Sequence, residues 1–536
     1  MVKEREDVLD VFIKQFKVLY GQRCTYKCSC SNRYCPGYTQ FQPTQCASNT
    51  SYGTPSFCSV PGRMADFNAS SVRVPSVGVP DNLVKTVQCW SSGIDPYFAQ
   101  YSGITLWRYL GTPQGFFRSY PGSDRVSCTD YDPRTRPWYI AASSGPKDVV
   151  LILDTSGSMS NFNRISLAKA AATKVLNTLT INDYIGVVQF SNGASIISSP
   201  SGLLLPATLS NLLSVQAAVD NIAIGGETNY EKAFQMAFQM IRNSKTQEKS
   251  TGCETLILFL TDGVANLGAV DDALLGEIAT LNAGVDAKIF TYSLGAQAAV
   301  LLPKAIACAN NGVWAQINDG GDLSSQMGNY YNYLASSIIN RTRAVWTEPY
   351  VDASGAGLVV TVAKAFYDET ASPPLFLGVV GIDVKVDELL AVATSDQLLE
   401  YLVYRAIMCP VVSITPCGLE FMRSQVVNEN GATSKCEVNL TCPERDIPQQ
   451  SCLQQGIDYG FCNVVAGSEY TKEAACCPEH VVEGGPNIAV IVGCAVGIPL
   501  GVLLLVGIGF LIYDRCSKTS HVTTTTGVPQ SLKEET

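Results

Sequence analysis

The chain has 536 residues, of which 46% are hydrophobic and only 16% are charged, so its composition is that of a folded protein. Its formal net charge of −10 argues against a nucleic-acid partner, because binding to phosphates needs a basic surface. The two histidines, His480 and His521, lie near the C-terminus, which excludes most histidine-based catalysis from the main folded region, and we do not expect an enzyme.

The first 146 residues combine a helical pattern with aromatic strands. Residues 1–20 mix charged and apolar side chains at helical spacing, which is typical of an amphipathic helix and not of a signal peptide; we infer that a signal peptide is missing from this sequence. Residues 107–120 are aromatic and punctuated by glycine, as in strands, and the run YDPRTRPWY follows at residues 131–139. This flank predicts half of an antiparallel α+β sheet.

Residues 147–339 have a different pattern, in which short apolar runs alternate with helical spacing. Short apolar runs predict buried strands at residues 149–153, 184–190 and 255–260. Such an alternation predicts an α/β fold with a doubly wound, mostly parallel sheet covered on both faces. Ligands of these sheets sit at the carboxyl edge of the strands.

Polar residues follow the predicted strands at that edge. Two carboxylates and three hydroxyls from three loops form a set of hard oxygen ligands, which suits Mg²⁺, Ca²⁺ or Mn²⁺ and not zinc. The alternative is that the serines cap the next helix and the second aspartate lies in a turn. The candidate metal ligands are Asp154, Ser156, Ser158, Thr228 and Asp262.

The second flank, residues 340–405, contains the strand-like runs 357–362 and 375–386 and predicts the other half of the antiparallel sheet. Residues 406–487 read as a cysteine-rich juxtamembrane stalk. Residues 488–513 are 26 residues without a charge, about 39 Å as a helix, which is long enough to cross a membrane. Arg515 and Lys518 follow directly, so we expect residues 514–536 to be a cytoplasmic tail and the N-terminal region to be extracellular.

The cysteines and glycosylation motifs suit an exterior location. Of the 20 cysteines, all but Cys494 and Cys516 precede the apolar run, which leaves an even number, 18, for disulfides in an oxidising compartment. The sequence does not reveal how they pair. Motifs for N-glycosylation occur at Asn49, Asn68, Asn340 and Asn439.

The motif D-T-S-G-S at residues 154–158, with the later threonine and aspartate, resembles the metal-ion-dependent adhesion site of von Willebrand factor A domains. The resemblance implies that the five candidates act as metal ligands or hold them, with one coordination position open for a partner's carboxylate. The flanks resemble the two halves of a double Cache sensor domain, on the runs GFFRSYP, YDPRTRPWY and GVVGID. An A domain inserted after RPWY is the arrangement of the auxiliary alpha-2/delta subunits of voltage-gated calcium channels.

A subset of Cache domains binds free amino acids, and this chain matches the pattern of that subset. Arg136 would bind the carboxylate and Asp383 the ammonium. The alternative is that the aromatic residues are core and that Arg136 and Asp383 form a structural pair. The matching residues are Tyr131, Arg136, Trp138, Tyr139, Tyr350 and Asp383.

These resemblances lead us to expect a single-pass plasma-membrane glycoprotein that binds a membrane protein, such as a calcium-channel pore subunit, through its metal site. A metal-dependent adhesion or ligand receptor unrelated to channels is the alternative. A sensor that signals through its span is less favoured, because residues 514–536 contain no signalling region. The chain also departs from the alpha-2/delta pattern, since those chains are typically about twice as long.

Overall fold

The computed structural model describes residues 2–21, 44–45, 64–66, 70–73, 87, 90–101, 107–123, 132–321, 327, 329–338, 344–352, 357–371, 374–391, 408–424, 426, 428, 431–436 and 442. The chain divides into a unit of residues 1–478 and a second unit of residues 479–536, and every described residue belongs to the first. No helix of the described part is long and apolar enough to cross a membrane. The predicted span, residues 488–513, and the predicted tail lie outside the described residues.

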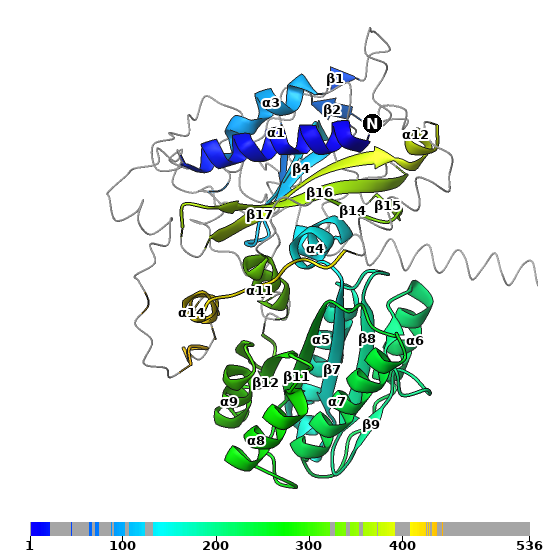
Figure 1. The fold of residues 1–536 in the computed structure, drawn as a ribbon, viewed down its shortest axis with the longest axis vertical. Helices are drawn as coiled ribbons and strands as arrows, with labels where there is room; N and C mark the ends of the chain where they lie inside the picture. The colour runs from blue at the N-terminus through cyan, green and yellow to red at the C-terminus, as the bar shows by residue number, and fades with distance from the viewer. Residues whose placement is uncertain are drawn as a thin grey trace, which may run out of the picture. The chain divides into compact units, whose positions relative to one another are not determined.

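The first unit contains a mostly parallel sheet (Figure 1). Its order is β10-β8-β7-β11-β12-β13, with β9 paired to β8; β10 and β9 run antiparallel to β8, and the other pairs are parallel. The strands are β7 (Lys147–Asp154), β8 (Tyr184–Phe190), β9 (Ala194–Ile196), β10 (Leu205–Pro206), β11 (Glu254–Thr261), β12 (Lys288–Leu294) and β13 (Trp314–Ile317).

Helices cover both faces of this sheet, because β7 carries apolar side chains on both of its faces. Leu151 of β7 shares a core with Ala171 of α5, whereas the next residue, Ile152, shares a different core with Phe234 of α7. The expected doubly wound α/β fold is therefore confirmed. The helices of this part are η4 (Gly157–Asn163), α5 (Arg164–Leu176), α6 (Leu209–Asp220), α7 (Tyr230–Thr246), α8 (Asp271–Asn282), α9 (Leu301–Ala309) and α11 (Asn329–Ser337).

The two flanks meet in one antiparallel sheet of order β14-β16-β17-β4-β5-β3, with β15 paired to β16. The two flanks are joined by the pairing of β17, from the second flank, with β4, from the first, in which Val380 lies opposite Leu110. We call this the Cache-like sheet. Its strands are β3 (Ser71–Arg73), β4 (Arg108–Gly111), β5 (Phe117–Tyr120), β14 (Val345–Trp346), β15 (Tyr350–Val351), β16 (Leu358–Asp368) and β17 (Leu375–Lys385).

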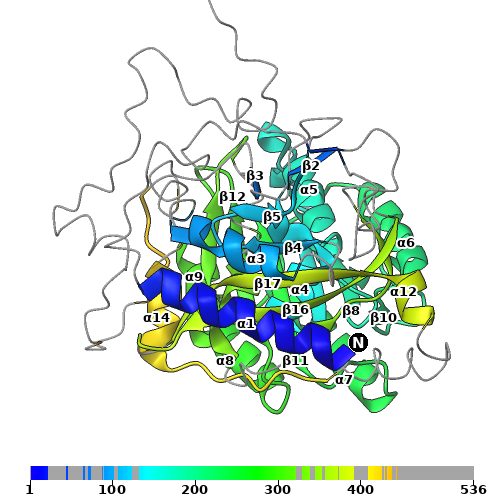
Figure 2. The ribbon, with the colours of Figure 1, turned by 90° about the horizontal axis from the view of Figure 1, so that it is seen from above.

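The N-terminal amphipathic pattern forms α1 (Val2–Gly21), which lies across the Cache-like sheet (Figure 2). Phe12 and Phe16 of α1 are fully buried in a core that includes Val362 and Ile382 of the sheet. Helix α4 (Pro137–Ser144) contributes Trp138 and Tyr139 to the core that also contains Leu151 and Ala171. Smaller elements are η2 (Ser92–Ile94), α3 (Asp95–Gln100), η3 (Pro133–Thr135), α12 (Val386–Leu390), and the sheet of β1 (Thr44–Gln45), β2 (Met64–Asp66) and β6 (Gly122–Ser123).

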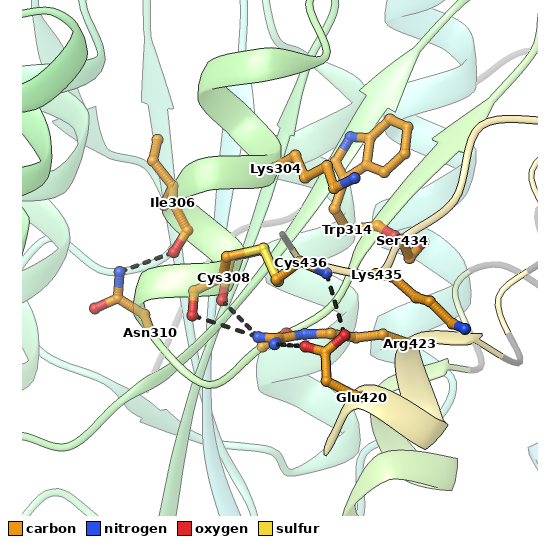
Figure 3. The surroundings of a disulfide bond; sticks show 12 residues. Lys304, Ile306, Cys308, Asn310, Trp314, Glu420, Arg423, Ser434, Lys435 and Cys436 are labelled. Carbon is orange, nitrogen blue, oxygen red and sulfur yellow. Dashed lines mark hydrogen bonds and ion pairs between the residues drawn. A yellow bond between two sulfur atoms is a disulfide. The ribbon is translucent and has the colours of Figure 1, made fainter. Parts of the chain in front are cut away.

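Residues 408–436 are attached to the parallel-sheet domain by disulfides and hydrogen bonds. Cys409 pairs with Cys253 and Cys436 with Cys308, while Cys417 pairs with Cys442. Within this segment, α14 (Pro416–Ser424) directs Arg423 toward the end of α9, where its Nη2 donates to the carbonyl of Cys308 at 3.4 Å (Figure 3). These pairings confirm disulfide bonding for six of the cysteines.

Edge strand β13 is covered by the same segment. The N–H of Gln316 donates to Oδ1 of Asn428 at 2.8 Å, and the hydroxyl of Ser434 donates to the carbonyl of Trp314. A sheet edge has backbone groups that would otherwise pair with another chain, so side chains that satisfy them protect the edge. The predicted stalk thus begins with a segment that completes the neighbouring domain.

Candidate functional site

The first loop of the site follows β7 and is held by Asp154, the last residue of that strand. The N–H of Ser156 donates to Asp154 Oδ1 at 2.8 Å, and the hydroxyl of Thr261, at the end of β11, donates to Asp154 Oδ2 at 2.6 Å. Asp154 is fully buried. One carboxylate therefore joins the ends of two neighbouring parallel strands.

The second loop, Gly225–Thr228, packs directly on the first. The N–H of Gly157 donates to the carbonyl of Gly226 at 2.9 Å, and the N–H of Gly225 donates to the carbonyl of Thr155 at 2.8 Å. Gly226 has φ +88°, and a Cβ there would lie 2.4 Å from Oδ1 of Asn192, so this position requires glycine.

The third loop follows β11 and brings Asp262 to the other two. The hydroxyl of Ser158 donates to Asp262 Oδ1 at 2.7 Å and lies 3.0 Å from the hydroxyl of Ser156. A Cβ built at Gly263 would lie 3.4 Å from both Ser158 Oγ and Thr228 Oγ1, so these two hydroxyls flank the same glycine. The structure thus gathers all five predicted metal-site residues at the carboxyl edge of the sheet. We call these loops the three-loop site.

The electrostatics of the three-loop site favour a cation. Burial raises the pKa of Asp154 to about 6, and the neighbouring charge of Asp262 adds to the increase. Burial likewise raises the pKa of Tyr230, whose hydroxyl donates to the carbonyl of Gly263 at 2.6 Å. Two buried carboxylates side by side are costly unless positive charge compensates them.

The residues present fit a divalent ion that prefers oxygen. The described residues contain no group of three or more His, Cys, Asp or Glu side chains placed to hold a metal, so an ion here would depend on the hydroxyls as well as the two carboxylates. Such an oxygen set suits Mg²⁺ or Ca²⁺. The residues that would hold the ion are the five of the three-loop site.

Arg164, at the start of α5, is part of this site and was not predicted from the sequence. Its Nη1 donates to Asp262 Oδ2 at 3.1 Å, and its Nε donates to Oδ1 of Asp319 at 3.2 Å. Gly295 leaves the necessary room, because a Cβ there would lie 2.3 Å from Arg164 Nε. Arg164 therefore supplies Asp262 with a fixed positive charge. No local pattern could identify it, because its carboxylate partners are 98 and 155 residues away.

One of the residues predicted to bind an amino acid, Asp383, lies in the Cache-like sheet among hydroxyl groups. Asp383 of β17 is buried, and its Oδ1 accepts hydrogen bonds from Thr361 Oγ1 at 2.6 Å, from Tyr350 Oη at 3.5 Å and from the hydroxyl of Tyr109. Burial raises the pKa of Asp383 to about 8, and the charge of Asp352 adds to the increase. Sequence reasoning missed Tyr109 and Thr361, although Thr361 lies opposite Asp383 in the strand register.

The other predicted pocket residues have different surroundings. Arg136 is half-buried before α4, and Trp138 and Tyr139 are core residues of α4. The ring centroids of Trp138 and Tyr109 are 4.6 Å apart, so Trp138 packs on a residue that contacts Asp383. Tyr131 and the four predicted glycosylation sites, Asn49, Asn68, Asn340 and Asn439, lie outside the described residues.

Comparison with known proteins agrees with this architecture. Residues 149–264 match the von Willebrand factor type A domain family, and residues 311–391 match the family described as methyl-accepting chemotaxis protein-like, first PDC sensor domain. A solved structure of a von Willebrand factor type A protein from Catenulispora acidiphila is 18% identical, with a TM-score of 0.32, over 45% of this chain and 58% of that chain. The parallel-sheet domain is a von Willebrand factor A-type domain, and it is set into a Cache-like sensor sheet.

Calcium-channel subunits are among the relatives of the whole arrangement. The chain is 30% identical over 347 residues to the voltage-dependent calcium channel subunit alpha-2/delta-3 of Rattus norvegicus, covering 61% of this chain and 31% of that protein. It is 32% identical over 312 residues to subunit alpha-2/delta-4 of Homo sapiens, covering 54% and 27%. The predicted resemblance to the alpha-2/delta subunits is therefore confirmed. It spans about a third of the length of these relatives.

Proposed function

We propose that this chain is an auxiliary, alpha-2/delta-like subunit at the plasma membrane that binds a carboxylate of a membrane-protein partner, such as a calcium-channel pore subunit, at the three-loop site. The observation that carries the proposal is the convergence of Asp154 and Ser158, at and just after the end of β7, with Asp262, which follows β11. The family relation to calcium-channel subunits supports the choice of partner.

When bound, a divalent cation supplies the positive charge to which a partner's carboxylate can attach. This chain's residues prepare for it by placing two buried carboxylates and three hydroxyls in loops at one edge of the sheet. Holding these groups in position before binding reduces the cost of ordering them when the partner arrives. The proposed role is therefore binding and not catalysis.

We further propose that the Cache-like sheet binds a free amino acid between Arg136 and Asp383. A guanidinium can take a carboxylate through two parallel hydrogen bonds, and a buried carboxylate can take an ammonium. The raised pKa of Asp383 favours this reading, because an ammonium beside it would stabilise the ionised form. The aromatic rings of Tyr109 and Trp138 would form an apolar wall for the ligand side chain.

The metal site is tested by co-purification of the full chain with a calcium-channel pore subunit, with Mg²⁺ or with chelator. We expect recovery with Mg²⁺ only, and loss in a variant carrying Asp154→Ala and Ser156→Ala. The control is Asp220→Ala, an exposed carboxylate of α6. Recovery that survives both chelator and the double variant would contradict the proposal. Metal-dependent binding to cells or matrix without binding to the pore subunit would favour an adhesion receptor instead.

The amino-acid pocket is tested by thermal melting of the full chain with single free amino acids. At about 100 times Kd the ligand should add about 2.7 kcal/mol of stability. Arg136→Ala should abolish the shift. The absence of a shift with every amino acid, or an unchanged shift in the variant, would rule out this pocket.

A further inference from the structure

A separate cavity lies where the A-type domain meets the Cache-like sheet. Its volume is about 440 Å³. One wall comes from Pro137 and Ala141 of α4, a second from Leu209 and Leu212 of α6, and a third from the connection between β14 and β15, which contains Glu348. We call it the junction cavity. Interfaces between domains are common places for small-molecule sites.

The walls of the junction cavity are largely apolar, and apolar side chains are exposed at its rim. Leu209 is 74% exposed and Ile181 is 47% exposed, and both line the cavity. A single exposed leucine needs no explanation. Two large apolar side chains at the mouth of one cavity indicate a surface that an apolar group would cover favourably.

One charged side chain breaks this apolar character. Glu348 is one of the residues that line the cavity, and its Oε1 is buried with no hydrogen-bond partner in the described part of the chain. The nearby Asp183 repels it, and burial raises the pKa of Glu348. Asp183 is already satisfied, because the ammonium of Lys147 lies 3.1 Å from both of its oxygens. The described part of the chain therefore places a negative charge near Glu348 and gives its Oε1 no hydrogen-bond donor.

We propose that the junction cavity binds a small organic cation, with a compact apolar body and one ammonium group that pairs with Glu348. The apolar body would cover Leu209 and Leu212, and the ammonium would remove the cost of leaving a buried carboxylate oxygen without a partner. An anionic molecule of the same shape would be repelled by the ionised carboxylate of Glu348. This site is distinct from the three-loop site, and among the described residues it shares only Tyr350 with the predicted amino-acid pocket.

The cavity also has a consequence for the two domains. A molecule in it would contact α6 of the A-type domain together with α4 and the β14–β15 connection of the Cache-like part. Binding would therefore stabilise the contact between them, since a ligand favours the arrangement that it binds.

The test uses three matched probes on the purified full chain: phenethylammonium, the neutral 2-phenylethanol and the anionic phenylacetate. Titration calorimetry should show saturable binding of the ammonium and about tenfold or weaker binding of the other two, as expected for loss of a charge-assisted contact. Glu348→Gln should weaken the ammonium by about tenfold or more and leave the alcohol unchanged. The control Glu369→Gln removes an exposed carboxylate that pairs with Lys17 and should have no effect.

Two further variants test whether the ammonium binds in the junction cavity. Leu212→Trp should fill the cavity and prevent binding of the ammonium while Mg²⁺ uptake persists, which shows that the domain still folds. Equal binding of the three probes, or unchanged ammonium binding in Glu348→Gln, would overturn the proposal. Loss of binding in Asp383→Asn but not in Glu348→Gln would assign the amine to the amino-acid pocket and would also overturn it.

Discussion

Replacing Arg164 by methionine tests how the charge of the three-loop site is balanced. The guanidinium is buried and lies between Asp262 and Asp319, at 3.1 and 3.2 Å. Removing one partner of a buried ion pair typically costs about 3–5 kcal/mol, because the other charge stays buried without compensation. For a domain of this size each kcal/mol lowers the melting temperature by roughly 2–4 °C, so we expect a fall of about 6–20 °C in chelator.

The informative result is the response of this variant to Mg²⁺. A cation bound beside Asp262 would replace the lost positive charge, so Mg²⁺ should raise the melting temperature of Arg164→Met by more than it raises that of the unaltered chain. Differential scanning fluorimetry with Mg²⁺ and with chelator measures both increments. The control Lys174→Met removes an exposed charge from the same helix and should change neither. Equal increments in Arg164→Met and the unaltered chain would refute the reasoning.

Three further predictions concern the fold and the Cache-like sheet. Burial raises the pKa of Asp383 to about 8, above an unfolded value of about 3.9, so between pH 4 and pH 8 the folded chain keeps a proton that the unfolded chain loses. The free energy of unfolding therefore falls as the pH rises through this range. Asp383→Asn should raise the melting temperature relative to the unaltered chain at pH 8 and not at pH 4. Gly312→Ala would put a Cβ 1.9 Å from a backbone carbonyl oxygen of β12, so it should lower the free energy of unfolding, measured in urea, by about 3 kcal/mol or more. Gly276→Ala, in helix α8, would put a Cβ where no atom lies within 4 Å, so it should raise the free energy of unfolding by about 0.5–1 kcal/mol. Lys147→Met should cost about 3–5 kcal/mol in the same assay, because it leaves the carboxylate of Asp183 buried, and adding Asp183→Asn should recover part of the loss.

Four of the five metal-site residues could be found in the sequence because they follow apolar strands, and the fifth, Thr228, because it ends a glycine-containing loop before a helix. Asp154 and Asp262 end up close together since β7 and β11 are neighbours in register, with Leu153 opposite Leu260. The apolar runs identify the strands, but only tertiary pairing decides which strands are neighbours. Arg164 was missed for that reason, because both of its partners come from other strand ends.

The Cache-like sheet and the disulfides show the same limit. The sequence predicted that each flank is half of an antiparallel sheet, but not which strands pair. Gly381 in β17 pairs with Tyr109 in β4, and these residues are more than 270 positions apart in the sequence. The hydrogen bond between Tyr109 and Asp383 joins the same two segments. The even number of exterior cysteines predicted disulfides, but not that Cys308 would pair with Cys436 to attach a later segment to α9. Such contacts depend on the folded chain path, which local sequence does not encode.

The most direct test of the central claim is calorimetric titration of Mg²⁺ into the metal-free full chain and into Asp154→Ala. The account predicts saturable uptake that disappears in the variant. Absence of uptake by the unaltered chain, or identical uptake by both proteins, would contradict it.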